Sequence, residues 1–381
     1  PEGAPLNAKE LEILAQWIAG GVLETKSSVA KKSTKPKVDM AVTVTSGKPE
    51  GPIAKPEHVL LEPVVVTPRT TSVTAMGASP WTSLVAFGGV KQILLYDTDT
   101  KQLAGIFPYT EGYARTLSFS RNGSLLVMGG GRGGKLGHAI VWDVKTGKRI
   151  VEVGKEFDQV MSADISPDQK MVVIGSPSKK VKVYDTATGE ELYTISKHTE
   201  WIMGTAFSPD GVLLASSDRN GNVMVWEAAN GGEFYVLGQH KASSTDLAWR
   251  ADSNVLASSS RDGSIIVWEM TEGKQIATWQ AHGSGTESLS FTPEGTLVTC
   301  GLDGSVSHWD IKGSKLADLP KQPDVATQVV SLHDGKTCVV GNFMGEVKMF
   351  DLKMKKEVGT LSSNPPLISQ RILEAEKRAT E

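Results

Sequence analysis

The chain has 381 residues, a formal net charge of −3 at pH 7, 39% hydrophobic residues and 22% charged residues. This near-neutral charge predicts no nucleic-acid partner and no attraction to an anionic membrane. No apolar run approaches the roughly 18 residues that suggest a transmembrane helix. Two cysteines, Cys300 and Cys338, are too few for a disulfide framework or a cysteine-rich zinc site, and we expect buried free thiols.

The opening stretch PEGAPLNAKELEILAQWIAGGVLET predicts one short amphipathic helix over about 8–19. Asn7 and Glu10 form a variant of the capping box, and Gly20 follows as a helix stop. Leu11, Leu14, Trp17 and Ile18 fall on one helical face. A helix this short is not stable alone, so it needs a body on which to pack.

Residues 1–25 resemble the last helix of planctomycete-type c-type cytochrome domains, and are then the end of a truncated haem domain. The Cys-x-x-Cys-His motif and the axial methionine of that family are absent, so no haem ligand is assigned in this chain. The resemblance implies haem c in a segment upstream, a bacterial source, a redox partner, and a periplasmic or cell-surface location. The alternative is a lone helix that docks on the rest of the chain.

Residues 26–57 contain seven lysines and four prolines with few apolar residues, which predicts a linker. The segment VLLEPVVV, residues 59–66, is strand-like. At the other end, residues 362–381 predict the start of a C-terminal helical segment after two prolines.

A repeat of about 42 residues dominates the rest of the chain. Each unit has an apolar run that ends in an aromatic residue and an acid, and the acids are Asp97, Asp143, Asp185, Glu227, Glu269, Asp310 and Asp351. Short alternating apolar runs in each unit are separated by turns such as Ser-Pro-Asp-Gly at 208–211, which predicts four antiparallel strands.

This repeat resembles that of the WD-repeat family, whose units have a similar period and four strands each. The resemblance implies an all-β fold, a seven-bladed β-propeller over residues 58–361. The segment 59–66 either replaces the outer strand of the last blade, tying the ring together, or lies along an edge.

The resemblance also implies a structural hydrogen-bond tetrad of His, Ser or Thr, Asp and Trp in three blades. The matching residues are His198, Asn220 and Trp226; His240, Asp262 and Trp268; and His282, Asp303 and Trp309. We interpret these periodic residues as buried structural groups and not as catalytic or metal sites. The other blades have Val90, Leu136, Ser178 and Met344 at the acid position, so we expect them to depend more on apolar packing.

The stretch GGGRGGKLG, residues 129–137, has most of a nucleotide-binding P-loop. A P-loop needs Ser or Thr after the lysine and a helix after the glycines, whereas Leu136 and a strand follow here. We therefore predict a hairpin loop and no nucleotide hydrolysis. The loop is either a flexible surface loop or a contact for an anionic ligand or partner through a nest of N–H groups.

In a WD-repeat propeller, loops between second and third strands share one face with the segments that join blades. The residues expected on this face are Tyr113, Arg132, Lys135, His138, Gln159, Trp201, Arg219 and Arg261. Trp201 is the strongest candidate, because exposed aromatic residues are favoured binding anchors. The alternative is that Trp201 packs against its own blade.

From these patterns we expect a monomeric, non-enzymatic propeller that binds a protein partner, with no cofactor or metal in this chain. The cytochrome resemblance makes it part of a larger exported c-type cytochrome fusion protein. The alternatives are an electron-transfer protein in which the propeller is the docking module, a cytosolic scaffold unrelated to haem, and a hydrolase that works at the central channel.

Overall fold

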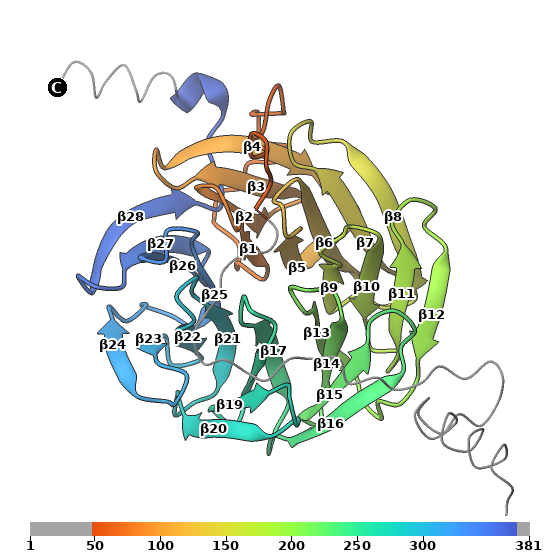
Figure 1. The fold of residues 1–381 in the computed structure, drawn as a ribbon. Helices are drawn as coiled ribbons and strands as arrows, with labels where there is room; N and C mark the ends of the chain where they lie inside the picture. The colour runs from red at the N-terminus through yellow and green to blue at the C-terminus, as the bar shows by residue number, and fades with distance from the viewer. Residues whose placement is uncertain (1–47, 372–381) are drawn as a thin grey trace, which may run out of the picture. The chain divides into compact units, whose positions relative to one another are not determined.

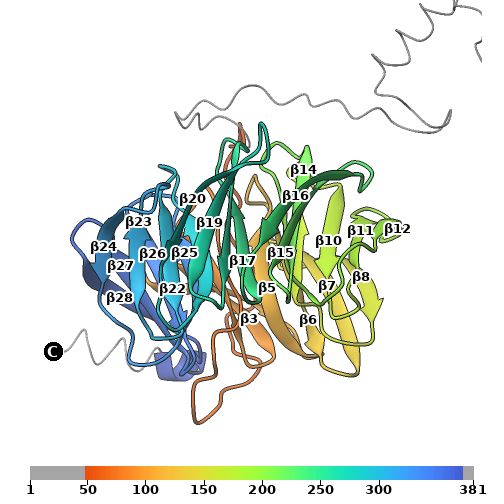
Figure 2. The ribbon, with the colours of Figure 1, turned by 90° about the horizontal axis from the view of Figure 1, so that it is seen from below.

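The computed structural model describes residues 48–371, and these form seven four-stranded antiparallel sheets around a central channel (Figure 1). The predicted seven-bladed all-β propeller is therefore confirmed. Seen from the side, the strands run between two faces from which the connecting loops project (Figure 2). The predicted helix over 8–19 and most of the predicted linker lie outside the described residues.

Each blade consists of four strands that are consecutive in the chain. Blade one has β1 Met76–Ala78, β2 Leu84–Gly89, β3 Gln92–Asp97 and β4 Gln102–Pro108; blade two has β5 Tyr113–Phe119, β6 Leu125–Arg132, β7 Leu136–Asp143 and β8 Arg149–Glu156. Blade three has β9 Ser162–Ile165, β10 Met171–Gly175, β11 Val181–Asp185 and β12 Glu191–Ile195; blade four has β13 Ile202–Phe207, β14 Leu213–Asp218, β15 Asn222–Glu227 and β16 Glu233–Gln239. Blade five has β17 Ser244–Trp249, β18 Val255–Ser260, β19 Ser264–Glu269 and β20 Gln275–Gln280; blade six has β21 Thr286–Phe291, β22 Leu297–Gly301, β23 Val306–Trp309 and β24 Lys315–Leu319. Blade seven has β25 Ala326–Ser331, β26 Thr337–Asn342, β27 Glu346–Asp351 and β28 Lys356–Ser362.

The hydrophobic core is divided among the junctions between neighbouring blades, and each of the seven junctions has its own cluster. Second strands such as β14 and β18 are buried along their whole length because both faces of each blade are covered. Cys300 and Cys338 are buried free thiols in one cluster between blades six and seven.

Inner strands around the channel are also joined across blades by side-chain hydrogen bonds. Ser118 of β5 donates to Asp164 of β9 at 2.7 Å, and the Asp164 carboxylate also accepts from the backbone N–H of Phe207 at 2.8 Å. Asp246 of β17 accepts from the Ser288 hydroxyl of β21 at 2.9 Å. Burial raises the pKa of the Asp164 and Asp246 carboxyl groups to about 6, because removal from water penalises the charged form.

The ring closes without any exchange of strands between its ends. β28 is the outer strand of blade seven, and the segment 59–66 lies along the edge of blade one, where Leu60 forms a single bridge with Ile106 of β4. Hydrogen bonds outside the strand ladders join the two ends: the Asn364 amide bonds to both backbone groups of Thr67, at 3.1 and 2.6 Å, and the Val73 N–H donates to the Asn342 carbonyl at 3.2 Å. Of the two alternatives for residues 59–66, the edge position is the one observed.

The contacts of the propeller extend beyond its predicted boundary. The N–H of Glu57 donates to the carbonyl of Lys145 at 2.7 Å, and Ala54 packs on the cluster between blades one and two. A helical turn begins at residues 368–371, where the Arg371 N–H donates to the Leu367 carbonyl. Among residues 48–371, no helix is long and apolar enough to cross a membrane.

Candidate functional site: the loop face of blades two to four

The glycine-rich stretch is a regular β-hairpin. β6 and β7 pair through it, with Gly129 opposite Ala139, Gly131 opposite Gly137 and Arg132 opposite Leu136. The turn is closed by a hydrogen bond from the Lys135 N–H to the Arg132 carbonyl at 3.0 Å. The extra residues of this blade therefore lengthen a hairpin, and strand β7 follows the lysine as predicted.

Glycine is required in this hairpin because other backbone segments press against it. A Cβ built on Gly137 would lie 1.9 Å from the carbonyl oxygen of Asp158, and one on Gly130 would lie 2.2 Å from that of Tyr113. Both distances are far below van der Waals contact. The hairpin thus lies directly between the segment that enters blade two and the segment that enters blade three.

The turn of the hairpin binds a carboxylate of the chain itself. The Gly134 N–H donates to Asp158 Oδ1 at 3.2 Å, and the same oxygen accepts from the Gln159 N–H at 2.8 Å. Arg132 and Lys135 at the hairpin tip are exposed to solvent. The tip therefore presents two cations, while its turn N–H is directed at an internal anion.

Two large aromatic side chains flank the hairpin. Tyr113 opens β5 and is 64% exposed, and Phe157, between β8 and β9, is 78% exposed. Phe157 is absent from the residues predicted from the sequence. Its place between two acids, Glu156 and Asp158, in a segment that joins blades is the signal that was available.

Trp201 and Arg219 form a pair on the next blade. The Arg219 guanidinium carbon lies 4.7 Å from the Trp201 ring centroid. The backbone N–H of Arg219 also donates to the Trp201 carbonyl at 2.9 Å. Trp201 is 37% exposed, so one part of its ring is covered and another part faces solvent. Such stacking is worth about 0.5–1 kcal/mol at an exposed site.

Three other residues predicted on the loop face differ in their exposure to solvent: His138, Gln159 and Arg261. His138 was predicted on the loop face, and this is wrong: it is 1% exposed, with the Tyr109 hydroxyl 3.0 Å from Nε2 and the Glu152 carboxylate 2.6 Å from Nδ1. Its place opposite Gly130 in the ladder turns the ring into the junction with blade one. Gln159 is half-buried, and the exposed Arg261 side chain pairs with Glu287 at 3.1 Å.

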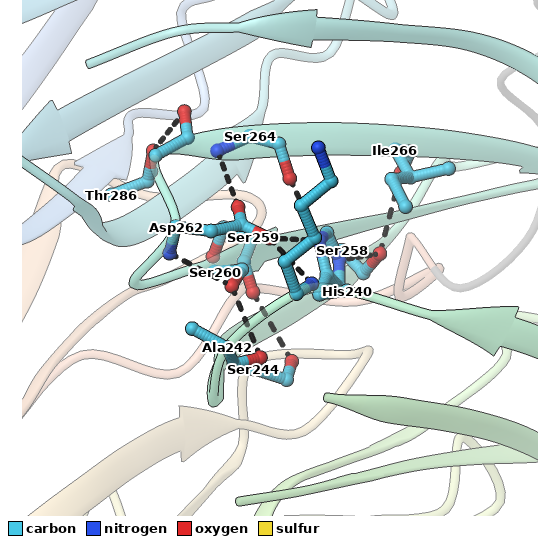
Figure 3. Close-up of polar contacts among 12 residues, drawn as sticks. His240, Ala242, Ser244, Ser258, Ser259, Ser260, Asp262, Ser264, Ile266 and Thr286 are labelled. Atoms are coloured by element: carbon cyan, nitrogen blue, oxygen red, sulfur yellow. Dashed lines mark hydrogen bonds and ion pairs between the residues drawn. The ribbon is translucent and has the colours of Figure 1, made fainter. Parts of the chain in front are cut away.

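The histidine tetrads lie inside the blades. In blade five, His240 Nε2 is 2.8 Å from the Ser258 hydroxyl (Figure 3). The same hydroxyl also accepts from the Trp268 indole N–H at 3.2 Å. On the other side of the ring, Nδ1 is 2.9 Å from Ser264, and Asp262 lies beyond at 3.9 Å. In blade six, His282 has the same arrangement with Thr299, Trp309, Ser305 and Asp303.

Blade four has a different acid from the one predicted. Asp218 lies 2.8 Å from His198 Nδ1, whereas Asn220 is exposed in the turn and its N–H donates to Asp218. Asp218 ends β14 inside the blade, so its carboxylate reaches the ring directly. Ser216 connects His198 to Trp226, at 2.6 and 2.7 Å.

Two blades that were expected to depend on apolar packing have polar networks of their own. In blade two this network is Tyr109, His138 and Glu152. At blade three, the buried Glu156 carboxylate accepts from Ser176 at 3.1 Å and pairs with Lys182 at 2.7 Å. These blades therefore have buried polar contacts beside their apolar packing, built from residues other than those of the tetrad.

Within residues 48–371, no group of three or more His, Cys, Asp or Glu side chains is placed to hold a metal ion. The central channel contains a cavity of about 360 Å³ lined by residues of the inner strands of all seven blades. Its buried carboxylates, Asp164 and Asp246, are both engaged in hydrogen bonds between blades.

Comparison with known proteins bears on the propeller. Residues 116–379, more than half of the chain, match the family described as the IFT122 first beta-propeller. No curated protein matches the chain. With seven four-stranded blades and this match, the chain belongs to the IFT122 first beta-propeller family.

Proposed function

We propose that the propeller is a non-catalytic protein-interaction module whose partner binds the loop face of blades two to four. The observation that carries this proposal is the aromatic arc, which we define as Tyr113, Phe157 and Trp201. These side chains lie at the entrances of three successive blades and are all exposed to solvent. Exposed aromatic side chains on a rigid framework favour protein binding, because little conformational entropy is lost when they are covered.

The charges beside the arc support the same use of this face. Arg132 and Lys135 extend from the hairpin tip between Tyr113 and Phe157, and Arg219 stacks on Trp201. Arginine next to an aromatic ring is a frequent pair at binding hot spots. The arc and its cations fit a partner surface that offers apolar pockets with carboxylates at their rim.

The proposal can be tested by site-specific photo-crosslinking of the intact chain in extracts of its source. A benzophenone amino acid at position 157 should capture one defined protein. The same probe at Val236 is the control, because Val236 is 61% exposed on the outer strand β16, away from the arc. Equal capture of the same protein at both positions would contradict the proposal.

The captured protein then allows a direct affinity measurement. Trp201→Ala and Phe157→Ala should each weaken binding about tenfold or more, as expected for hot-spot side chains. Val236→Ala should leave the affinity unchanged. Unaltered affinity in both arc variants, with folding retained, would place the interface elsewhere.

The predicted haem domain, redox partner and periplasmic or cell-surface location depend on residues 1–25, outside the described residues. They remain a separate prediction with a test of their own. A pyridine-haemochrome spectrum of the full-length gene product, made with c-type maturation machinery, should show covalent haem. A product without haem would leave the interaction proposal unchanged and remove the electron-transfer alternative.

A further inference from the structure

The turns that follow the inner strands form a ring at the channel end opposite the loop face. Six of them are closed by the same backbone hydrogen bond, and the residues at their second position are Arg121, Pro167, Pro209, Ala251, Pro293 and His333. Proline is favoured at this position because its fixed φ suits the turn. Blades two, five and seven instead have Arg121, Ala251 and His333, and blades two and seven flank blade one, whose own turn contributes Trp81.

These departures from the repeat surround a pocket, which we call the mouth pocket. Its volume is about 260 Å³, and its lining includes Trp81, Arg121, Trp249, Phe291 and His333. Several lining residues, among them Arg121, also line the channel cavity, so the two spaces adjoin. The volume is slightly below the range of about 300–1,000 Å³ typical for drug-sized ligands, so a ligand of one ring system fits best.

The aromatic and cationic groups of the mouth pocket are held in place. The Trp81 indole N–H donates to the Arg121 carbonyl at 2.7 Å, and the Arg121 guanidinium carbon lies 5.8 Å from the Trp81 ring centroid. The Trp249 indole N–H donates to the Ala206 carbonyl at 3.0 Å. Burial lowers the pKa of Arg121, which nevertheless stays cationic at neutral pH.

Two polar atoms of the lining are buried without a protein partner. Among the described residues, neither Ser79 Oγ nor His333 Nδ1 has a hydrogen-bond partner, and Ser79 is 1% exposed. A buried polar atom without a partner costs about 1–3 kcal/mol, so most such atoms are satisfied in folded proteins. Their presence around one pocket, beside the half-buried guanidinium of Arg121, points to a ligand with hydrogen-bonding oxygens.

We propose that the mouth pocket binds an aromatic carboxylate. The ring would lie among Trp81, Trp249 and Phe291, and the carboxylate would face Arg121 and His333. A planar carboxylate matches the fork of guanidinium donors, and offset aromatic contacts stabilise the ring. The source is either a free aromatic acid or the C-terminal aromatic residue of a peptide, since both present the same groups.

The first test is calorimetric titration of the intact chain with indole-3-acetate and with its uncharged amide. The acid should bind at least tenfold more tightly than the amide, because only the acid carries the charge that Arg121 attracts. A short peptide with a free C-terminal Trp, compared with the same peptide amidated, distinguishes the two sources. Equal binding of acid and amide, or no binding at millimolar concentration, would overturn the proposal.

Substitutions in the lining test whether the ligand binds in the mouth pocket. Arg121→Met should weaken the acid at least tenfold, whereas Arg149→Met, which removes an arginine stacked on Trp142 outside the pocket, should leave the affinity unchanged. Ala251→Phe fills the pocket from one of its turns and should abolish binding. If Arg121→Met does not fold, retained binding in Ala251→Phe still refutes the site. These variants leave the aromatic arc intact, so failure here is distinguishable from failure of the proposed function.

Discussion

His198 Nδ1 lies 2.8 Å from Asp218 Oδ2, and both side chains are completely buried. Burial alone would raise the pKa of Asp218, but hydrogen bonds from His198 and Asn222 lower it below its ordinary value. The charged carboxylate is thus stabilised within blade four. This contact and its neighbours give the first prediction.

Asp218→Ala should strongly destabilise the propeller. It leaves the His198 ring nitrogen and the Asn222 amide without their buried acceptor, and each buried polar group left without a partner costs about 1–3 kcal/mol. Asn220 is exposed in the turn, so Asn220→Ala should lower the free energy of unfolding much less than Asp218→Ala does. Urea denaturation of both variants checks this. Similar midpoints for the two would contradict the assignment of Asp218 as the acid that supports His198.

The hairpin glycines provide a matched pair of substitutions. Gly137→Ala places a methyl group 1.9 Å from the Asp158 carbonyl, and should cost about 1–3 kcal/mol through forced backbone movement. Gly134→Ala meets no atom within 4 Å, and its φ of +66° should cost only about 1 kcal/mol. Thermal unfolding compares the two. A larger loss in Gly134→Ala would contradict the close contact with Asp158.

His240 and His282 should stay neutral at pH values well below the ordinary pKa of histidine. Burial lowers the pKa of each to about 4, against about 6.5 in an unfolded chain. Between these values the unfolded chain binds protons that the native protein does not, so this contribution to stability is lost as the pH falls from 6.5 to 4. NMR of the imidazole nitrogens should show no titration of either ring above pH 5. Titration near pH 6.5 would refute the buried, neutral assignment.

Asp164 gives the opposite pH dependence. Its native pKa of about 6 exceeds the unfolded value of about 3.9, so its contribution to stability is present at low pH and is lost as the pH rises through 6. Asp164→Asn keeps an acceptor for the Phe207 N–H and should be more stable than the unmodified protein at pH 7, by up to about 3 kcal/mol. The gain should disappear near pH 4. A gain that does not change with pH would rule out titration of Asp164 as its cause.

Both cysteines should be inert in the native protein. Burial raises the pKa of the Cys300 and Cys338 thiols, and the thiolate is the reactive form. Modification by an aromatic disulfide reagent should therefore proceed only as fast as the protein unfolds. Reaction in native buffer at the rate of a free thiol would show that the junction of blades six and seven opens locally.

Much of the fold could be predicted because the residues that define the repeat specify strands and turns locally. The aromatic-acid ends of third strands, and turns such as the one at 208–211, specify four strands per unit without long-range information. Ring closure could not be predicted in the same way. Residues 59–66 have the same apolar pattern whether they replace an outer strand or lie on an edge, and the Asn364 contacts with Thr67 join residues far apart in the chain.

The tetrads show why equal spacing does not guarantee equal contacts. Asp262 and Asp303 lie in turns and approach their histidines beside the hydroxyls of Ser264 and Ser305. In blade four, Asn222 occupies the place of these serines, and Asp218 contacts the His198 ring directly. A pattern aligned on the turn therefore selected Asn220, because the alignment could not show which acid points inward.

The exposure of loop-face residues was predicted correctly where they open a strand, and incorrectly where it depends on how far the strands of a hairpin stay paired. Tyr113 and Trp201 open their blades and are exposed, as the family pattern implies. His138 was misplaced because the hairpin strands extend through the glycines, which puts it opposite Gly130 and inside the junction. Whether a side chain near a loop faces solvent depends on the residue at which strand pairing ends. A glycine-rich sequence does not show which residue that is.

Because no blade shares a strand with another, the ring can be opened between any two neighbouring blades without dividing a sheet. All four strands of each blade are consecutive in the chain, so no hydrogen-bond ladder requires the last strand to return to the first. The junction between blades seven and one is held by apolar packing and by hydrogen bonds such as those of Asn364 with Thr67 and of Tyr96 with the Ser362 carbonyl. A circularly permuted chain that starts at blade four should therefore assemble the same ring, with the old seam bridged by a peptide and a new one left between blades three and four.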